Sequence, residues 1–480
     1  MNARVIAGLA AALIVGALPS LAASAGETPS GPARRPNIVF IFTDQQHAGM
    51  MSCTGNPYVK TPAMDSLAAA GARFERAYCA NPVCVPSRFS MMTGVLPSRI
   101  GMEDNSGMRL TVPPRILAHT MGRIFRDAGY ETAYGGKVHT PMDVAAMGFD
   151  QLTKDQRDGL ADACADFLRK QHDRPFLLVA SFINPHDICY MAIRDFARQT
   201  GVRQPVLDNA REEFAALDAA LEMPPGVSKE DFFTRLCPPL PANLEIPAGE
   251  PAGVVPPGAR NFRTYVRQNW TEERWRLHRW AYARLTERVD AEIGRVLAAL
   301  REAGLEENTL VVFSSDHGDH DSAHRLEHKS TFYEEAARVP LVVTWKGVTK
   351  PGLVDSTHLV STGLDLIPTL CDFAGLPPRP ELRGRSLRDL AEGRKPLQWR
   401  ESLVVESGRG RMVRTDRYKY IVYDSGSPRE QLIDLAEDPG EMQNLALDPA
   451  AAEVLRGHRQ LLKQWYADNN EKLEEKHVVQ

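Results

Sequence analysis

The sequence lacks any long run of basic residues, and its 480 residues carry a formal net charge of −4 at pH 7. Because a protein that binds a phosphate backbone needs a basic face, the charge pattern indicates no nucleic-acid partner. Beyond residue 25 the sequence also lacks an apolar run long enough to cross a bilayer. We therefore expect no stable membrane insertion.

Cysteine is scarce. The chain has 7 cysteines, and their spacing matches neither a zinc site nor a dense disulfide framework. The odd count leaves at least one thiol without a disulfide partner. Cys84 has the most unusual context, since Pro86, Ser87 and Arg88 follow it closely.

The first 25 residues differ from the rest of the chain. Arg4 precedes an apolar stretch from Val5 to Leu18, and small residues such as Ala23 and Ala25 close the segment. This order predicts a secretory signal peptide over residues 1–25. We therefore expect an exported protein, periplasmic or secreted; an uncleaved anchor is the alternative.

The composition is that of a soluble globular protein, with 43% hydrophobic and 25% charged residues. Near-continuous apolar runs predict buried strands at residues 36–43, 131–134, 176–182, 308–314 and 339–345. Helical spacing predicts helices at residues 61–74, 115–128 and 271–303. The alternation predicts an α/β fold, a mixed but mainly parallel sheet with helices on both faces.

The end of the chain changes character. Short strand-like runs predict a small antiparallel sheet, and they cover residues 402–405, 411–414, 418–423 and 431–435. A helix is expected near residues 450–474. We therefore divide the mature chain into a catalytic domain, 35–395, and a smaller C-terminal α+β subdomain, 396–480. Residues 190–262, rich in Pro and Gly, predict an irregular insertion over the site or a peripheral excursion.

Chemically active side chains follow the ends of predicted strands, where open α/β sheets bind ligands. Asp44 and Gln45 end the first strand, His186 follows a middle strand, and Asp316 and His317 end a late one. Carboxylate and amide oxygens suit a hard cation such as Ca²⁺ or Mg²⁺, for which a histidine would be an unusual ligand. Taken singly, each residue also fits a cap or a turn.

Cys84 opens a predicted helix that has Pro86 near its first turn. A helix N-terminus offers amide donors and a positive dipole end to an anion, and Arg88 would add a fixed charge. A buried, unreactive thiol is the alternative.

The segment Cys84-Val85-Pro86-Ser87-Arg88 resembles the C-x-P-S-R signature of the sulfatases, in the alkaline-phosphatase-like superfamily. Further stretches resemble family landmarks in family order: PNIVFIFTDQQ at Pro36, GYETAYGGKVH at Gly129, PFLLVASFINPH at Pro175, VVFSSDHGD at Val311, HKSTFYEEAARVP at His328 and RTDRYKYIVY at Arg414. The chain departs from the usual family pattern at Val95, Gln45 and His317.

The resemblance implies an alkaline-phosphatase-like fold and hydrolysis of a sulfate ester, by default on a carbohydrate. A formylglycine-generating enzyme would oxidise Cys84 to 3-oxoalanine (formylglycine), whose hydrate is the nucleophile. A bound Ca²⁺, or Mg²⁺, would be surrounded by Asp44, Gln45, residue 84, Asp316 and His317.

The resemblance also implies roles for the remaining charged residues. Arg88 would hold the modified residue, and Lys137 and Lys329 would clamp sulfate oxygens. His139 would help to expel sulfate, and His186 would protonate the departing alcohol. The two lysines and His139 also fit solvated surface positions, and His47, His320 and His324 fit either a pocket lining or the surface.

Other functions stay open at this point. The same superfamily includes hydrolases of phosphate diesters and phosphonate monoesters, whose reacting centre is close in size and geometry to sulfur. A non-catalytic binder of sulfated glycans would not need the Cys84 signature. A thiol hydrolase is disfavoured, because no His or Asn has a context typical of those families.

Overall fold

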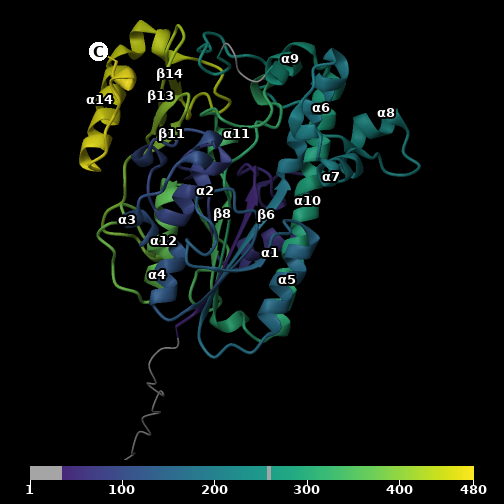
Figure 1. The fold of residues 1–480 in the computed structure, drawn as a ribbon. Coiled ribbons are helices and arrows are strands. Elements are labelled where there is room, and N and C mark those ends of the chain that lie inside the picture. Colours follow the sequence, from purple (N-terminus) through teal and green to yellow (C-terminus); the bar gives the residue numbers. More distant parts are fainter. Residues whose placement is uncertain (1–34, 257–260, 480) are drawn as a thin grey trace, which may run out of the picture. The chain divides into compact units, whose positions relative to one another are not determined.

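The computed structural model describes residues 35–256 and 261–479. Residues Arg35–Gln480 form one compact unit, shown in Figure 1. The predicted signal peptide lies outside the described residues. No helix in the described ranges is long and apolar enough to cross a membrane. The predicted boundary at residue 396 stays a prediction.

A sheet of 8 strands forms the centre, in the order β5-β4-β6-β1-β7-β8-β2-β9. Neighbouring strands are parallel from β5 to β7, whereas β8 runs antiparallel to β7 and to β2. The strands are β1 (Asn37–Asp44), β2 (Ala72–Phe74), β4 (Glu131–Gly136), β5 (Asp150–Thr153), β6 (Phe176–Pro185), β7 (Thr309–Ser315), β8 (Leu341–Thr344) and β9 (Leu353–Asp355). A separate pair joins β3 (Ala77–Tyr78) to β10 (Val360–Ser361).

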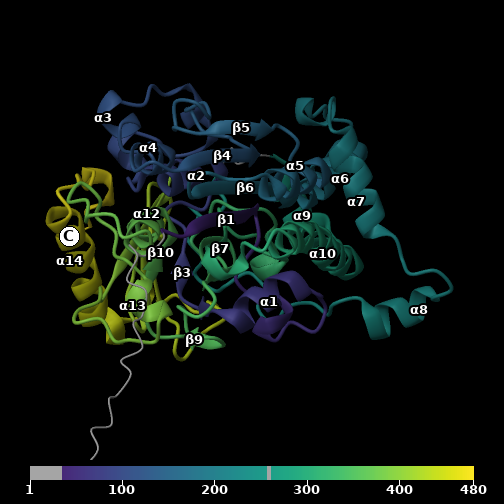
Figure 2. The ribbon, with the colours of Figure 1, turned by 90° about the horizontal axis from the view of Figure 1, so that it is seen from below.

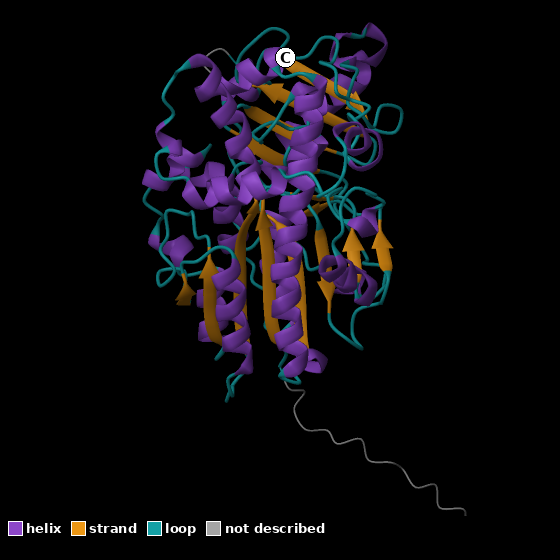
Figure 3. Cartoon of the chain, turned by 90° about the vertical axis from the view of Figure 1, so that its right-hand side faces the viewer, coloured by secondary structure: helices purple, strands orange, loops and turns teal. Residues whose placement is uncertain are grey.

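The central strands are apolar on both faces because helices cover both faces. Side chains alternate along a strand, so Phe40 of β1 lies in one hydrophobic cluster and Val39 in another. One cluster joins the sheet to α2 (Cys84–Thr93), α4 (Met121–Asp127) and α12 (Thr362–Phe373). The other joins it to α1 (Pro62–Ala70), α5 (Asp158–Arg169) and α10 (Glu272–Glu302). Figure 2 shows the strands between these helices, and Figure 3 shows helices in front of the sheet.

The C-terminal prediction is confirmed. An antiparallel sheet of 4 strands follows the order β11-β12-β13-β14, and one hydrophobic cluster packs a long helix against it. These elements are β11 (Leu403–Ser407), β12 (Gly410–Arg414), β13 (Tyr418–Tyr423), β14 (Glu430–Asp434) and α14 (Ala452–Asp468). The expected helix at 450–474 is therefore shorter at its end than predicted.

The helix predicted at residues 61–74 is wrong at its C-terminal end. Helix α1 ends at Ala70, and β2 follows at once. At Gly71 a Cβ would lie 2.3 Å from the carbonyl oxygen of Val343, so the chain passes too close to β8 for any side chain. Tertiary contact thus ends a segment whose spacing continues the helical pattern.

The helix predicted at residues 115–128 is broken into α3 (Pro114–Leu117) and α4. Thr120 is extended at the start of α4, and its hydroxyl donates a 2.9 Å hydrogen bond to the carbonyl oxygen of Met147. A partner distant in sequence fixes this break.

The prediction that residues 190–262 are irregular is also wrong. The region holds α6 (Cys189–Thr200), α7 (Arg211–Leu221) and α8 (Lys229–Asp231), and α9 (Asn261–Asn269) begins at its end. Helices α6, α7 and α9 share a hydrophobic cluster with α10. Further along the chain come α11 (Glu334–Ala337) and α13 (Arg388–Ala391).

Candidate active site

Two neighbouring parallel strands place the first pair of carboxylates. Strands β1 and β7 pair in register, with Thr43 opposite Ser315, so Asp44 and Asp316 leave the same edge of the sheet side by side. Both side chains are fully buried. The backbone N–H of Gln45 donates to Asp316 Oδ1 over 3.1 Å, which joins the two strand ends.

Helix α2 begins at Cys84, and all of its residues are buried. The Cys84 Sγ lies 2.9 Å from Lys329 Nζ, 3.2 Å from His317 Nε2 and 3.8 Å from Asp44 Oδ1. Burial and Asp44 would raise the pKa of the Cys84 thiol, but Lys329, Lys137 and His317 hold it well below its ordinary value. The site therefore favours an anion on side chain 84.

Arg88, one turn further along α2, ties the strand ends together. Its Nε donates to Asp316 Oδ2 over 2.7 Å, and a terminal nitrogen donates to Asp44 Oδ2 over 2.8 Å. The other terminal nitrogen donates to the Lys137 carbonyl and to Ser181 Oγ, each over 2.8 Å. Every part of this buried guanidinium has a polar partner, as a buried charge requires.

The two predicted clamp lysines are buried, so the surface alternative for them is wrong. Lys137 follows Gly136, whose φ is 91°. A Cβ at position 136 would lie 2.1 Å from the carbonyl oxygen of Ser181, so only glycine fits there. The resulting turn brings Lys137 Nζ to 2.5 Å from Asp44 Oδ2. Lys329 enters from the loop before α11, and its side chain is 8% exposed. Burial would raise the pKa of Asp44, but Lys137 and the other cations hold it well below its usual value.

Four buried groups fit a divalent cation. The ligand atoms of Asp44, Cys84, Asp316 and His317 all lie within 4.8 Å of one another. His317 Nδ1 lies 2.9 Å from the Gly318 carbonyl oxygen. Since a carbonyl only accepts, Nδ1 carries a proton, and Nε2 faces the carboxylates, 3.5 Å from Asp316 Oδ1 and 3.7 Å from Asp44 Oδ1. Two carboxylates and the Nε2 of a neutral imidazole form a donor set for a metal ion.

Gln45 lies beside this cluster with its amide held at both ends. Its Oε1 accepts hydrogen bonds from Lys329 Nζ over 2.8 Å and Cys189 Sγ over 3.0 Å. Its Nε2 donates to Asp319 Oδ2 over 2.6 Å. Asp319 thus fixes the amide with its oxygen toward the site. Sequence reasoning missed Asp319 and Cys189; only the place of Asp319 in the stretch VVFSSDHGD hinted at a role.

The remaining histidines differ in their placement. His186 follows the end of β6 and lines a cavity beside Lys329. Burial, then Lys137 and Lys329, lowers the pKa of His186 to about 3. His139 is half-buried in the loop after β4, and its ring makes no hydrogen bond or ion pair with Cys84 among the described residues. The buried His320 and His324 and the half-buried His47 are absent from the cavity's lining in the described residues.

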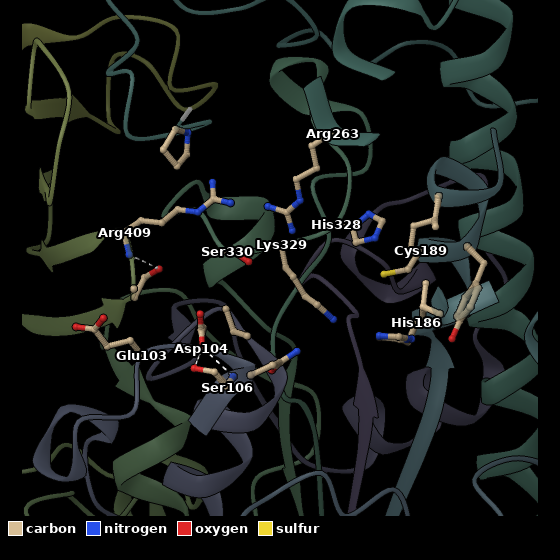
Figure 4. Close-up of a pocket in the computed structure, with 18 residues that line it drawn as sticks. Glu103, Asp104, Ser106, His186, Cys189, Arg263, His328, Lys329, Ser330 and Arg409 are labelled. Atoms are coloured by element: carbon tan, nitrogen blue, oxygen red, sulfur yellow. Dashed lines mark hydrogen bonds between the residues drawn. The ribbon is translucent and has the colours of Figure 1, made fainter. Parts of the chain in front are cut away.

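The cavity opens above the Cys84 cluster and has a volume of about 600 Å³. Figure 4 shows residues from distant parts of the chain around it. Tyr190, Ile193, Val206 and Pro256 of the region 190–262 line this cavity. The lining residues include Glu103, Asp104, Ser106, His186, Cys189, Tyr190, Arg263, His328, Lys329, Ser330 and Arg409.

Comparison with known proteins agrees with this geometry. A family model described as sulfatase matches residues 36–376, and one described as N-sulphoglucosamine sulphohydrolase, C-terminal, matches residues 322–468. The Delta 4,5-hexuronate-2-O-sulfatase of Bacteroides thetaiotaomicron is 29% identical over 453 residues, covering 89% of this chain and 88% of that protein. The choline-sulfatase of Rhizobium meliloti is 30% identical over 447 residues, covering 86% and 83%.

Solved structures show the same fold. A 2-O GAG sulfatase superposes with a TM-score of 0.75 at 27% identity, covering 91% of this chain and 93% of that chain. The phosphonate monoester hydrolase of Agrobacterium radiobacter superposes with a TM-score of 0.69 at 22% identity, covering 93% and 99%, which is a likeness of fold alone. This chain therefore belongs to the sulfatase family and is a sulfuric ester hydrolase.

Proposed function

We propose that the protein hydrolyses a sulfate ester on a carbohydrate, with formylglycine made from Cys84 as its nucleophile and Ca²⁺ as its metal ion. The observation that carries this proposal is the position of the Cys84 Sγ, 2.9 Å from Lys329 Nζ and within the group formed with Asp44, Asp316 and His317. Mg²⁺ has the same donor preference.

Formylglycine and the divalent cation are the two groups that the proposed reaction needs in addition to the unmodified chain. Beside a divalent cation, hydrated formylglycine would supply a nucleophilic hydroxyl and a second hydroxyl through which sulfate could be released. Asp44, Asp316 and His317 would hold the cation, and the Gln45 oxygen faces the same space.

The chain's own cations would bind and orient the sulfate group. Lys137 and Lys329 converge on Asp44 and Cys84 from opposite loops, and preorganised charges stabilise the charge that develops on sulfate oxygens. Arg88 already has polar partners on every nitrogen, so its role is to hold Asp44 and Asp316 in place. His139 would assist the release of sulfate.

His186 would donate the proton that the departing alcohol needs. Its low pKa makes it neutral in the substrate-free protein. A sulfate anion bound between Lys137 and Lys329 would offset the two charges that depress this pKa, so protonation becomes easier once substrate is present. The acid is thus charged when the leaving oxygen requires it.

Two observations support a saccharide as the substrate. Relatives at 29% and 27% identity are named as sulfatases of a hexuronate and of a GAG. The cavity above Cys84 carries hydroxyl, carboxylate and cationic side chains, such as Ser106, Asp104 and Arg409, which suit the many hydroxyl groups of a sugar.

The central experiment is mass spectrometry on the peptide that contains residue 84, from protein produced together with a formylglycine-generating enzyme. We expect an aldehyde at residue 84 and turnover of sulfated saccharides. The Cys84→Ala variant should retain its circular dichroism spectrum and lose turnover. Fully active protein with an ordinary thiol at residue 84 would contradict the proposal.

The same protein preparation can distinguish sulfatase activity from phosphodiesterase and phosphonate monoester hydrolase activity. Rates on a sulfate ester, a phosphate diester and a phosphonate monoester would be measured in parallel, since sulfur and phosphorus centres fit similar sites. We expect the sulfate ester to have the largest kcat/KM. Binding of sulfated glycans with no turnover would instead favour a binding protein.

Export is a further part of the proposal, supported by the apolar N-terminal segment. Fractionation of cells that express the full chain should place the mature protein outside the cytoplasm. Its N-terminal sequence should begin after residue 23 or 25.

A further inference from the structure

Two arginines from distant segments meet in the cavity above Cys84. Arg263 belongs to α9, and Arg409 occupies the turn between β11 and β12 of the C-terminal sheet. Figure 4 shows their guanidinium groups pointing toward each other, with Arg409 across the cavity from His186. Like charges brought together in this way repel each other unless an anion joins them.

The surrounding structure holds each arginine in the cavity wall. The Arg409 guanidinium donates to the Val254 carbonyl, and its backbone carbonyl accepts from Asp424 N over 2.8 Å. The adjacent Gly408 N donates to the Glu103 carbonyl over 3.1 Å. Arg263 is only 8% exposed, and Phe262 beside it packs against the ring of His328 at 5.0 Å.

The electrostatics around Arg409 are those of a cation without a counter-charge. No carboxylate in the described residues lies within ion-pair distance of its guanidinium. Burial, followed by the charge of Arg263, lowers the pKa of Arg409 to about 9. An anion between the two side chains would reverse the repulsion between them.

The acidic side chains of the same cavity form no ion pair with Arg409 within the described residues. Asp104 accepts hydrogen bonds from the backbone N–H and the hydroxyl of Ser106, over 2.8 and 2.6 Å. Glu103 Oε1 lies 3.5 Å from Lys476 Nζ. Both lie below the arginines in Figure 4, where they can accept hydrogen bonds from sugar hydroxyls.

We propose that Arg263 and Arg409 form a second anion-binding subsite, which recognises a carboxylate or a further sulfate on the same saccharide. This inference rests on the proposed function, because it assigns the sulfate that is cleaved to Lys137 and Lys329. Guanidinium groups bind carboxylate and sulfate oxygens through paired, charge-assisted hydrogen bonds. The preferred substrate is then an acidic saccharide, not a neutral sugar that carries a single sulfate.

The test measures kcat/KM of the matured protein on four sulfate esters. These are a monosulfated hexuronate, the matching monosulfated hexose, the same hexose with a second sulfate, and 4-nitrophenyl sulfate. We expect kcat/KM to be at least about tenfold higher for an acidic saccharide than for the neutral hexose. The better of the two acidic substrates identifies the anion as carboxylate or sulfate.

Variants assign the effect to the two arginines. Arg263→Gln and Arg409→Gln should each lower kcat/KM for the acidic saccharide about tenfold or more, mainly through KM. Their kcat/KM on 4-nitrophenyl sulfate should stay within about twofold of the unmodified protein. Arg198→Gln, which removes an exposed arginine from the end of α6, is the matched control and should change neither value.

A direct binding measurement is independent of turnover. Calorimetric titration of Cys84→Ala protein with the acidic saccharide should show weaker binding when Arg409 is changed to Gln or to Lys, at an unchanged Tm. Equal losses on every substrate, or equal wild-type rates on neutral and acidic saccharides, would overturn the subsite. Failure of the wild-type protein to cleave any of the four esters would instead contradict the proposed function.

Discussion

The pKa of His186 is set by burial and by the two lysines beside it. The lysines that would clamp sulfate also depress its pKa, to about 3. The side chain lines the cavity beside Lys329, whereas its Nδ1 is buried and makes no hydrogen bond within the described residues. A half-buried ring that lines the cavity is suited to meet a leaving oxygen.

This arrangement predicts a leaving-group effect in the His186→Ala variant. An alcohol is a poor leaving group and needs a proton, whereas 4-nitrophenolate does not. We expect kcat to fall about 10²–10⁴-fold on a sugar sulfate and less than about tenfold on 4-nitrophenyl sulfate. Steady-state kinetics on both substrates measure the contrast. A similar loss on both would show that His186 binds sulfate and does not supply the proton.

The cation cluster predicts a stability effect that needs no turnover. A metal ion at one hundred times its Kd would stabilise the folded protein by about 2.7 kcal/mol. Removal of a charged ligand in Asp316→Asn should abolish the increase in Tm that Ca²⁺ produces. Asp365→Asn is the matched control, since Asp365 is equally buried and pairs with Arg400 outside the site. The prediction is contradicted if Ca²⁺ raises the Tm of Asp316→Asn as it does that of Asp365→Asn.

Site residues were predictable from the sequence where a short motif or the end of an apolar strand marks them. Cys84 and Arg88 share one turn of a helix, and Asp44 and Asp316 each end an apolar strand. Arg409 carries no such signal. It reaches the cavity only because a hairpin of the C-terminal sheet packs on Glu103, and no local pattern predicts that contact.

At the scale of elements, α10 carries a buried carboxylate that the proposed chemistry does not use. Glu292 is 2% exposed, and its Oε1 lies 3.5 Å from Arg288 Nε, too far for a hydrogen bond. Burial, then the nearby Asp158, raises the pKa of Glu292 to about 7. The folded protein therefore binds this proton more tightly than the unfolded chain does.

The sign of the pH effect follows from that difference. A carboxyl whose pKa is raised on folding stabilises the fold below its unfolded value near 4.5, and this contribution is lost as the pH rises through about 7. Glu292→Gln should therefore increase the free energy of unfolding by about 1–3 kcal/mol at pH 8, with a smaller gain at pH 5. Urea unfolding at both pH values measures it.

Glu302→Gln is the control on the same helix. Its side chain is 60% exposed beside Arg169, so the change should stay within about 0.5 kcal/mol at either pH. An equal effect of Glu292→Gln at pH 5 and pH 8 would show that Glu292 does not titrate between them.

Element types were predictable where the hydrophobic period was long and regular, as along α10 and β1. Element ends were not, because contacts with partners far along the chain decide them. Thr120 bonds to Met147, and Gly71 passes close to Val343. The helices between residues 190 and 262 were missed since prolines and glycines separate them, and much of their packing is against α10.

At the scale of the whole unit, a buried ionic cluster joins the C-terminal sheet to α11, which follows Lys329 in the chain. Lys419 of β13 is fully buried, and its Nζ lies 2.6 Å from Glu334 of α11 and 2.7 Å from Glu441. The same Nζ donates to the Phe332 carbonyl over 2.9 Å. Because Lys329 precedes α11 by a few residues, the sheet braces the loop that would bind sulfate.

This cluster predicts that the sheet and the catalytic part unfold together. Calorimetry of the wild-type protein should show a single transition. Lys419→Met leaves Glu334 and Glu441 buried without their shared cation, which should lower the free energy of unfolding by about 3–5 kcal/mol. Lys346→Met, which removes a surface pairing with Glu307, should cost less than about 1 kcal/mol. Two separate wild-type transitions would show that the predicted boundary at residue 396 divides independent folding units, and that Lys419 does not couple them.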